Sequence, residues 1–232
     1  MDNNTIITID NLAKRFPIGG GEFTALKDIN LKFEAGEFAG FVGPSGSGKT
    51  TMLNIIGSLD NPSDGDVNVL NTSVKNISPK KASLLRKQHI GFIFQTYNLM
   101  PVYTVYENVE FPLLLLKKSA AERKKAVLDA LEWVGLMDKI KSRPKQLSGG
   151  ESQRVAIARA MVKRPEVVLA DEPTANLDTE NSHHILDTMV KLNKELNTTF
   201  LFATHDDKVI KYLNRIIRLE DGKVVADDII KK

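Results

Sequence analysis

The feature that most constrains the fold is a glycine-rich loop with the pattern GxxxxGKT, from Gly43 to Thr50. It comes directly after the short apolar run 38–42 and opens a helical pattern that extends to about Leu59. A strand, a glycine-rich loop and a helix in this order form a phosphate loop, whose backbone N–H groups surround phosphate oxygens. The loop therefore predicts an α/β protein that binds a nucleoside triphosphate.

The side chains of this loop have distinct predicted roles. Lys49 is expected to reach the β and γ phosphates, and the Thr50 hydroxyl is expected to coordinate Mg²⁺. Thr51 is expected to support the α phosphate. The residues predicted to contact the nucleotide here are Gly43, Pro44, Ser45, Gly46, Ser47, Gly48, Lys49, Thr50 and Thr51.

Two carboxylates follow the fully apolar run 167–170, which reads as a buried strand. Ligand sites in parallel sheets lie at the carboxyl ends of the strands, so Asp171 and Glu172 are expected at the phosphate site. Asp171 is predicted to hold Mg²⁺ through water. Glu172 is then free to polarise the attacking water, which makes it the predicted general base.

Two further polar residues follow apolar strands. Gln95 comes after the run 90–94 and is predicted to contact both the metal and the attacking water. His205 comes after the run 199–203, and at the end of a sheet strand beside a triphosphate we expect it to act in catalysis. His183 and His184 lie on a helical stretch without such a context, so we interpret them as surface residues.

A second motif lies about a hundred residues after the loop, at Leu147-Ser148-Gly149-Gly150-Glu151. Ser148 and Glu151 have the spacing of a capping box at a helix start. The glycines leave the first N–H groups unshielded, and a helix N-terminus attracts anions. Two phosphate surfaces on one chain indicate that a second copy of the chain completes each nucleotide site.

Strand and helix patterns alternate along the chain. The expected strands are 6–9, 29–33, 38–42, 67–70, 90–94, 167–170, 199–203, 216–219 and 223–225. Such alternation predicts a mostly parallel sheet with helices on both faces. The early alternating strands indicate a small antiparallel layer at one edge. We expect one domain, 1–232, with a core of about 1–95 and 162–232 and an inserted helical subdomain of about 96–161.

Composition narrows the function classes. The net charge is only +3 and the richest basic run, 117–125, is interrupted by Ala and Glu, so we expect no basic face and no nucleic-acid partner. The chain has no cysteine, which fits a reducing compartment. Its first residues lack the pattern of a signal peptide, and the apolar run 111–116 is far shorter than the ~20 residues that span a bilayer. We expect a soluble chain that reaches a membrane only through a partner.

Taken together, the phosphate loop, Gln95, the Ser148 motif, Asp171-Glu172, Asn176-Leu177-Asp178 and His205 resemble the ATP-binding subunit of ATP-binding-cassette (ABC) transporters. The resemblance covers essentially the whole chain. It implies an ATPase that forms a head-to-tail dimer around two ATP molecules with Mg²⁺. Ser148, Gly149 and Gly150 would serve the partner's ATP, and Asp178 would reach across the interface.

In this family an aromatic residue near the N-terminus stacks on adenine. Phe16 matches that position, with Phe23 as the rival candidate. The family usually has Tyr there, but stacking needs only the face of the ring. The second motif also departs from the family, because Glu151-Ser152 stands where Gln-Gln is common.

The segments 94–101, 104–113 and 171–178 look like the lipoprotein-releasing and macrolide-exporter type, whose signature antimicrobial-peptide resistance transporters share. That resemblance implies a peripheral subunit on the cytoplasmic face of the inner (plasma) membrane. Its integral membrane partner would be gripped in a groove near Gln95, Tyr97, Leu99, Met100 and Val102. Two alternatives stay open: a cassette ATPase that gates cell-wall remodelling in a division complex, and, more remotely, a soluble cassette ATPase of DNA repair or translation.

Overall fold

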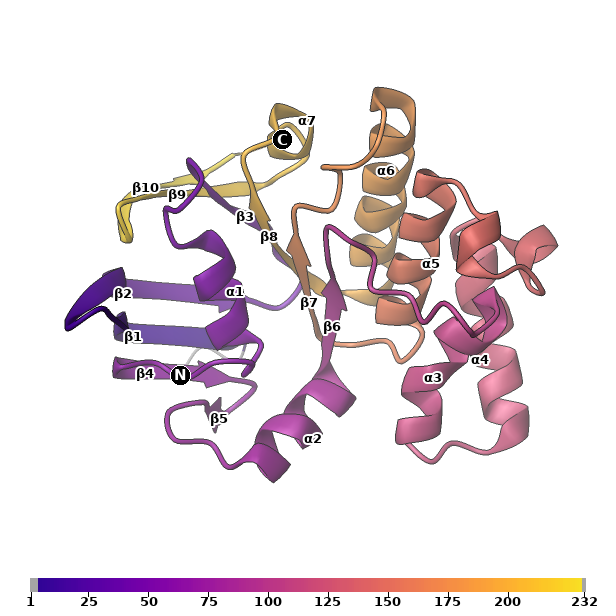
Figure 1. Ribbon diagram of the computed structural model, residues 1–232, viewed down its shortest axis with the longest axis horizontal. Helices are drawn as coiled ribbons and strands as arrows, with labels where there is room; N and C mark the ends of the chain where they lie inside the picture. The colour runs from indigo at the N-terminus through magenta and orange to yellow at the C-terminus, as the bar shows by residue number, and fades with distance from the viewer. Residues whose placement is uncertain (1–3, 231–232) are drawn as a thin grey trace.

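A six-stranded sheet forms the centre of the computed structural model, which describes residues 4–230 (Figure 1). Its strand order is β10-β9-β3-β8-β7-β6, and every pair except the β9–β10 hairpin is parallel. The strands are β3 (Phe38–Val42), β6 (Ile90–Ile93), β7 (Val167–Asp171), β8 (Thr199–Thr204), β9 (Arg215–Glu220) and β10 (Lys223–Ile229). The predicted mostly parallel sheet is confirmed.

A second sheet, antiparallel and four-stranded, lies beside the first in the order β2-β1-β4-β5. Its strands are β1 (Thr5–Ile18), β2 (Gly21–Glu34), β4 (Asp64–Val69) and β5 (Thr72–Ser73). Helix α1 (Lys49–Ile56) lies between the two sheets (Figure 1). The predicted antiparallel layer is therefore a separate sheet that packs across α1, while the antiparallel edge of the central sheet is the β9–β10 hairpin.

Helices cover the opposite face of the central sheet (Figure 1). They are α3 (Val105–Leu115), α4 (Ala120–Trp133), α5 (Gly149–Met161), α6 (Thr179–Leu196) and the short α7 (Asp207–Ile210), with 3-10 turns η1 (Met137–Lys139) and η2 (Pro144–Gln146). Helix α2 (Pro79–His89) stands apart at the edge, between β5 and β6.

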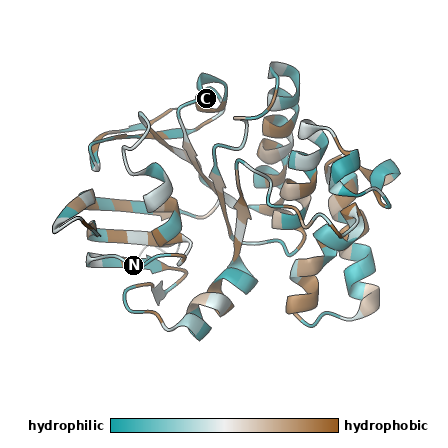
Figure 2. Ribbon diagram, in the orientation of Figure 1, coloured by the Kyte–Doolittle hydropathy of each residue, from teal (hydrophilic) through white to brown (hydrophobic). Residues whose placement is uncertain are grey.

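The core consists of two apolar clusters, one on each face of the central sheet. One joins α1 and the antiparallel sheet to residues such as Phe41 and Leu201. The other joins α3, α4, α5 and α6 to residues such as Phe38 and Phe202. The central strands therefore bury both faces, which is why they read as continuous apolar runs in brown (Figure 2).

Several element boundaries differ from the sequence expectations. Strands β1 and β2 are much longer than the expected strands 6–9 and 29–33. Helix α1 ends at Ile56 rather than near Leu59, because Gly57 closes it and Ser58 adopts a left-handed φ of 49°. Helix α2 was not predicted, although Ser78 caps it and Pro79 occupies its first turn, a recognised start signal. Asp221 and Gly222 form the turn of the β9–β10 hairpin.

Two expectations concern membranes and the N-terminus. Within residues 4–230, no helix is both long and apolar enough to cross a bilayer. The expectation about a signal peptide falls partly on residues 1–3, which lie outside the described part of the chain.

Candidate active site

The carboxyl ends of the central strands and the phosphate loop enclose a pocket of about 440 Å³. Nearly all residues predicted for one nucleotide site line it, although they come from five segments of the sequence. The lining residues are Phe16, Phe23, Ala25, Ser45, Gly46, Gly48, Lys49, Thr50, Thr51, Gln95, Asp171, Glu172, Ala175 and His205. The predicted residues that do not line it are Gly43, Pro44, Ser47, Ser148, Gly149, Gly150 and Asp178.

The glycines of the loop are required by its geometry. Gly48 has a φ of 104°, and a Cβ there would lie 2.7 Å from the Ala25 carbonyl oxygen. A Cβ at Gly43 would lie 2.1 Å from the Leu219 carbonyl oxygen, which belongs to β9. The loop can therefore turn sharply and pack against its neighbours only where side chains are absent.

The Lys49 ammonium lies inside the loop that it is predicted to serve. It donates hydrogen bonds of 2.8 Å each to the carbonyl oxygens of Gly43 and Pro44. Burial lowers the pKa of Lys49, while Glu172 and Asp171 oppose this shift. A buried cation held only by backbone carbonyls fits a site that receives anionic phosphate oxygens.

Thr50 and Asp171 join the start of α1 to the end of β7. The Thr50 hydroxyl donates to Asp171 Oδ1 at 3.1 Å. Burial raises the pKa of Asp171, and the Thr50 hydrogen bond opposes that shift. Among residues 4–230 there is no cluster of three or more acidic, His or Cys side chains that could hold a metal ion. A divalent cation here would therefore take its remaining ligands from phosphate oxygens and water, as Mg²⁺ commonly does.

Glu172 is held in a defined orientation at the end of β7. Its Oε1 lies 2.6 Å from His205 Nδ1, and its Oε2 accepts a 3.2 Å hydrogen bond from the Thr204 hydroxyl. The Glu172 backbone has a φ of 46°, uncommon for a side chain of this size. Both partners come from β8 and the loop after it, so the sheet fixes where this carboxylate points.

Phe16 and Phe23 lie opposite each other on β1 and β2, and both line the pocket. Phe16 is half-buried, with the Lys14 ammonium 4.8 Å from its ring centroid, whereas Phe23 is exposed. The two residues therefore do not compete for one position in the pocket. They form one aromatic pair at the mouth of the pocket.

The second motif forms the predicted capping box at the start of α5. The Ser148 hydroxyl accepts from the Glu151 N–H at 3.2 Å, and Glu151 Oε2 accepts from the Ser148 N–H at 2.8 Å. This hydrogen bond from Ser148 and an ion pair with Lys139 lower the pKa of Glu151. Ser148 and Gly149 are exposed and lie outside the pocket, so this helix start is free to meet another molecule.

Gly150 is linked to Asp178 through Asn181 at the start of α6. Asn181 donates to Asp178 Oδ1 and Oδ2 at 2.8 and 2.7 Å, which lowers the pKa of Asp178. A Cβ at Gly150 would lie 2.4 Å from Asn181 Oδ1. The second motif and Asp178, predicted to act at the dimer interface, therefore share one packed contact within the chain.

Sequence reasoning missed two contacts that connect these parts. Asn176 Nδ2 donates to the Gln95 carbonyl oxygen at 2.9 Å. Arg159 of α5 donates to the carbonyl oxygens of Tyr97 and Asn98 at 2.7 and 2.5 Å, and burial lowers its pKa. The signal for Arg159 was a charged residue inside the apolar run 155–161 of α5.

A separate apolar groove of about 470 Å³ opens beside Gln95, between α2 and α3. Of the residues predicted to grip a membrane partner, Met100 lines this groove, together with Leu59, Phe94, Phe111 and Leu115. The others do not line it. Leu99 packs against the core, Val102 is exposed, and the Tyr97 hydroxyl lies next to Gly149. Residues 97 and 98 both have a left-handed backbone, which turns this part of the chain away from the groove.

One of the two histidines interpreted as surface residues is placed differently. His184 is exposed, as expected, but His183 is half-buried, and its Nδ1 lies 3.0 Å from the Tyr212 hydroxyl. The interpretation of His183 as a surface residue is therefore wrong. Helix α6 turns this side chain toward the segment that follows α7.

The fold and the pocket define a phosphate-loop nucleoside triphosphatase whose second motif, at the start of α5, faces outward. The chain matches the ABC transporter family over residues 26–175. It is 40% identical over 224 residues to the lipoprotein-releasing system ATP-binding protein LolD of Legionella pneumophila, covering 97% of this chain and 99% of that protein. It is 43% identical over 225 residues to the macrolide export ATP-binding/permease protein MacB of Rhodopirellula baltica, covering 96% of this chain but only 33% of that longer protein.

Among solved structures, the chain is similar to the ATP-binding cassette MJ0796, solved as a dimer in a post-hydrolysis state bound to ADP and Pi. The TM-score is 0.90 at 40% identity, with 98% of this chain and 100% of that chain covered. The chain belongs to the ABC transporter family and is one of its ATP-binding ATPase subunits. The predicted family and the predicted likeness to the lipoprotein-releasing and macrolide-exporter type are confirmed.

Proposed function

We propose that two copies of this chain assemble head to tail around two ATP molecules. The observation that carries this proposal is the separation of two phosphate surfaces. The pocket holds the loop, Gln95, Asp171, Glu172 and His205, while the Ser148 motif faces outward elsewhere on the same chain. A head-to-tail arrangement would bring the Ser148 motif of one copy to the γ phosphate bound by the other.

Within each site the residues would have distinct roles. Lys49 and the loop N–H groups would hold the phosphates, and Phe16 with Phe23 would bind the adenine face. Thr50 and Asp171, with Gln95, would hold Mg²⁺, which supplies charge neutralisation when bound. Glu172 would orient and deprotonate the attacking water, and His205 would hold Glu172 in place.

The bound membrane subunit would occupy the groove between α2 and α3. The groove is apolar and lies directly beside Gln95, whose carbonyl is tied to Asn176. A segment of the membrane subunit bound in this groove would therefore be coupled to the position of the segment that carries Gln95. This arrangement makes the chain a peripheral subunit of an inner-membrane complex of the lipoprotein-releasing, macrolide-exporting or antimicrobial-peptide-resistance type. Relatives with the first two of these names favour that function over a role in cell division, DNA repair or translation.

Dimer formation tests the proposal directly. In a Glu172→Gln background, which should retain ATP, we expect ATP to convert the monomer to a dimer on size-exclusion chromatography. Ser148→Arg should abolish that shift, because the new side chain would occupy the phosphate surface. The matched control is Ser119→Arg, since Ser119 closes an equivalent capping box on α4 away from the pocket. A dimer that survives Ser148→Arg would contradict the head-to-tail arrangement.

A further inference from the structure

One long stretch of the chain carries basic residues and no acidic ones. Five Lys or Arg residues and no Asp or Glu lie between positions 67 and 106. The whole chain has a net charge of only +3, so the rest of it is net negative. The small net charge thus conceals an uneven distribution of charge along the chain.

Most of these cations lie on α2 or in the loop before it. Helix α2 buries Ala82 and Leu85 on one face. On the opposite face Lys80, Leu84 and Lys87 follow one another at helical spacing, and Leu84 is 50% exposed. We call these three residues, with Lys75 and Lys81 beside them, the α2 ridge.

The lysines of the ridge are not paired with the acidic groups that the structure describes around them. Within residues 4–230, Lys75, Lys80, Lys81 and Lys87 form no ion pair. The acidic groups that approach from neighbouring elements are otherwise engaged. Glu166 lies 3.0 Å from His89 at the far end of α2, and Asp66 accepts a hydrogen bond from Ser73. The ridge thus presents positive charge to the outside without internal compensation.

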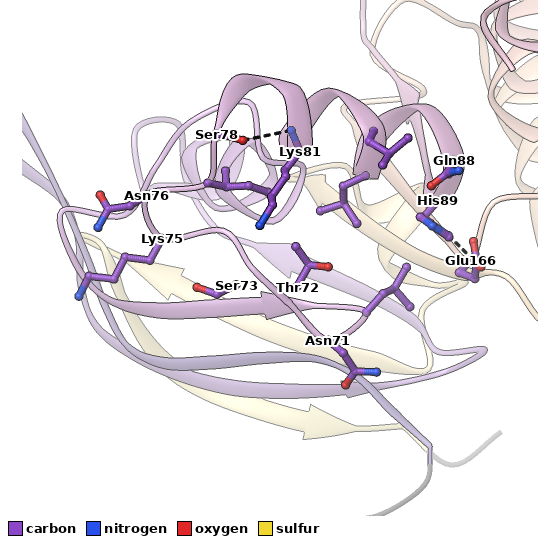
Figure 3. Close-up of a pocket in the computed structure, with 14 residues that line it drawn as sticks. Asn71, Thr72, Ser73, Lys75, Asn76, Ser78, Lys81, Gln88, His89 and Glu166 are labelled. Atoms are coloured by element: carbon purple, nitrogen blue, oxygen red, sulfur yellow. Dashed lines mark hydrogen bonds and ion pairs between the residues drawn. The ribbon is translucent and has the colours of Figure 1, made fainter.

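A hollow of about 690 Å³ adjoins the ridge, between α2 and β5 (Figure 3). Lys75 and Lys81 line it with the polar groups of Thr72, Asn76 and Ser78, beside leucine and isoleucine side chains. One carboxylate, that of Glu166, also lines the hollow, and it is paired with His89. Figure 3 shows Lys81 extending from α2 toward the strand that carries Thr72 and Ser73. Ammonium, hydroxyl and amide groups around one hollow suit a phosphate group.

The ridge lies on the same side of the molecule as the groove proposed for the membrane subunit. Helix α2 and the turn between α3 and α4 both lie along the lower edge of Figure 1. The end of α3, just before this turn, exposes Leu114 and Leu115, at 45% and 49%, and the apolar groove runs between α3 and α2. A membrane subunit seated in the groove would therefore bring both features toward the bilayer surface.

We infer that the α2 ridge and its hollow bind the headgroups of anionic phospholipids, so that this subunit touches the membrane itself as well as its membrane partner. Lysines around an exposed leucine are typical of surfaces that lie at the interface of an anionic membrane. The orientation of the ridge toward the bilayer rests on the proposed function. The lipid contact does not, because the isolated chain would make it without a membrane partner.

Vesicle flotation of the purified full chain tests the inference. We expect binding to vesicles of equal parts phosphatidylglycerol and phosphatidylcholine, no binding to phosphatidylcholine alone, and loss of binding at high salt. Lys75→Glu/Lys80→Glu should weaken binding at least about tenfold, since each Lys near an anionic surface contributes roughly fivefold. Glu at position 80 lies in the first turn of α2, where an acidic residue favours the helix, so folding should persist.

The matched control is Lys191→Glu/Lys194→Glu, the same charge change on the exposed side of α6. It should leave vesicle binding unchanged, and ATP-dependent dimer formation should persist in both double variants. If the wild-type chain fails to bind anionic vesicles while still forming ATP-dependent dimers, the inference is wrong and the proposed function stands. Retention of labelled duplex DNA in place of vesicles would also overturn it.

Discussion

His205 Nδ1 lies 2.6 Å from Glu172 Oε1, although the two residues are 33 positions apart in the sequence. Glu172 follows β7 and His205 follows β8, and these strands are parallel neighbours in the central sheet. The Thr204 hydroxyl holds the second carboxylate oxygen of Glu172. Residues at the end of β8 thus fix the position of the carboxylate that follows β7.

This relationship gives the first prediction. Glu172→Gln keeps the shape and one acceptor oxygen of the side chain but removes the base. We expect ATP binding to persist and phosphate release to fall by ~10² to 10⁴, the usual contribution of a general base. Steady-state phosphate release with a fluorescent-nucleotide binding assay measures both. Hydrolysis at the wild-type rate would show that Glu172 is not the base.

The second prediction concerns the contact between Gly150 and Asn181. Gly150→Ala places a methyl group 2.4 Å from Asn181 Oδ1, so Asn181 must move and its hydrogen bonds to Asp178 must weaken. We expect ATP-dependent dimer formation to fall while ATP binding to the monomer is retained. Gly135→Ala is a useful comparison, because no atom lies within 4 Å of its added Cβ, although its φ of 64° costs some stability. Normal dimer formation by Gly150→Ala would show that this contact can relax.

The third prediction concerns Arg159, which holds the chain just after Gln95. Arg159→Met removes the donors for the Tyr97 and Asn98 carbonyl oxygens. Hydrogen bonds from a charged donor contribute about 1.5–3 kcal/mol, so we expect a clear drop in thermal unfolding midpoint. Arg164→Met, which removes an exposed guanidinium 5.8 Å from the Trp133 ring, should cost much less. Equal losses in the two variants would rule out a special role for the Arg159 hydrogen bonds.

The fourth prediction is a pH dependence at Lys163. Its ammonium donates to the carbonyl oxygens of Arg86, Lys87 and Ile90 at the end of α2, and burial lowers its pKa from 10.5 to about 8. Between these values the unfolded chain binds more protons at this position than the folded chain. The contribution of Lys163 to the free energy of unfolding therefore rises with pH across that window and is constant below it.

Lys163→Met provides the measurement for this prediction. The difference in unfolding midpoint between the wild type and the variant should shift in favour of the wild type as pH rises from about 8 to 10.5. Other titrating groups cancel in that difference, because both proteins share them. Parallel pH profiles would show that Lys163 titrates normally in the folded protein.

Much of the site could be predicted because its chemistry follows local sequence. The loop from Gly43 to Thr50 needs glycines at fixed spacing, and Asp171 and Glu172 follow an apolar strand directly. The carboxyl ends of parallel strands meet at one edge of a sheet. Residues that directly follow such strands in the sequence are therefore expected to gather at that edge. The capping box at Ser148 is equally local, because it spans only one helical turn.

Other features depend on contacts between distant segments. No local pattern shows that Phe16 and Phe23 share one pocket, that Gly150 meets Asn181, or that Arg159 reaches the Tyr97 carbonyl. Each depends on how one element packs on another. The same holds for α2, because the composition does not show that Lys80, Leu84 and Lys87 lie on the side of the helix opposite buried Ala82 and Leu85.

The sequence by itself determined the phosphate loop, the order of the strands and helices, and the identity of the residues that carry the chemistry. It did so because backbone conformation, capping and hydrophobic periodicity act over a few residues. Only the tertiary structure decided which side chains face one pocket, which face outward, and where the lysines of α2 point. Those outcomes depend on the packing of both sheets around α1, and packing joins residues that lie far apart in the sequence.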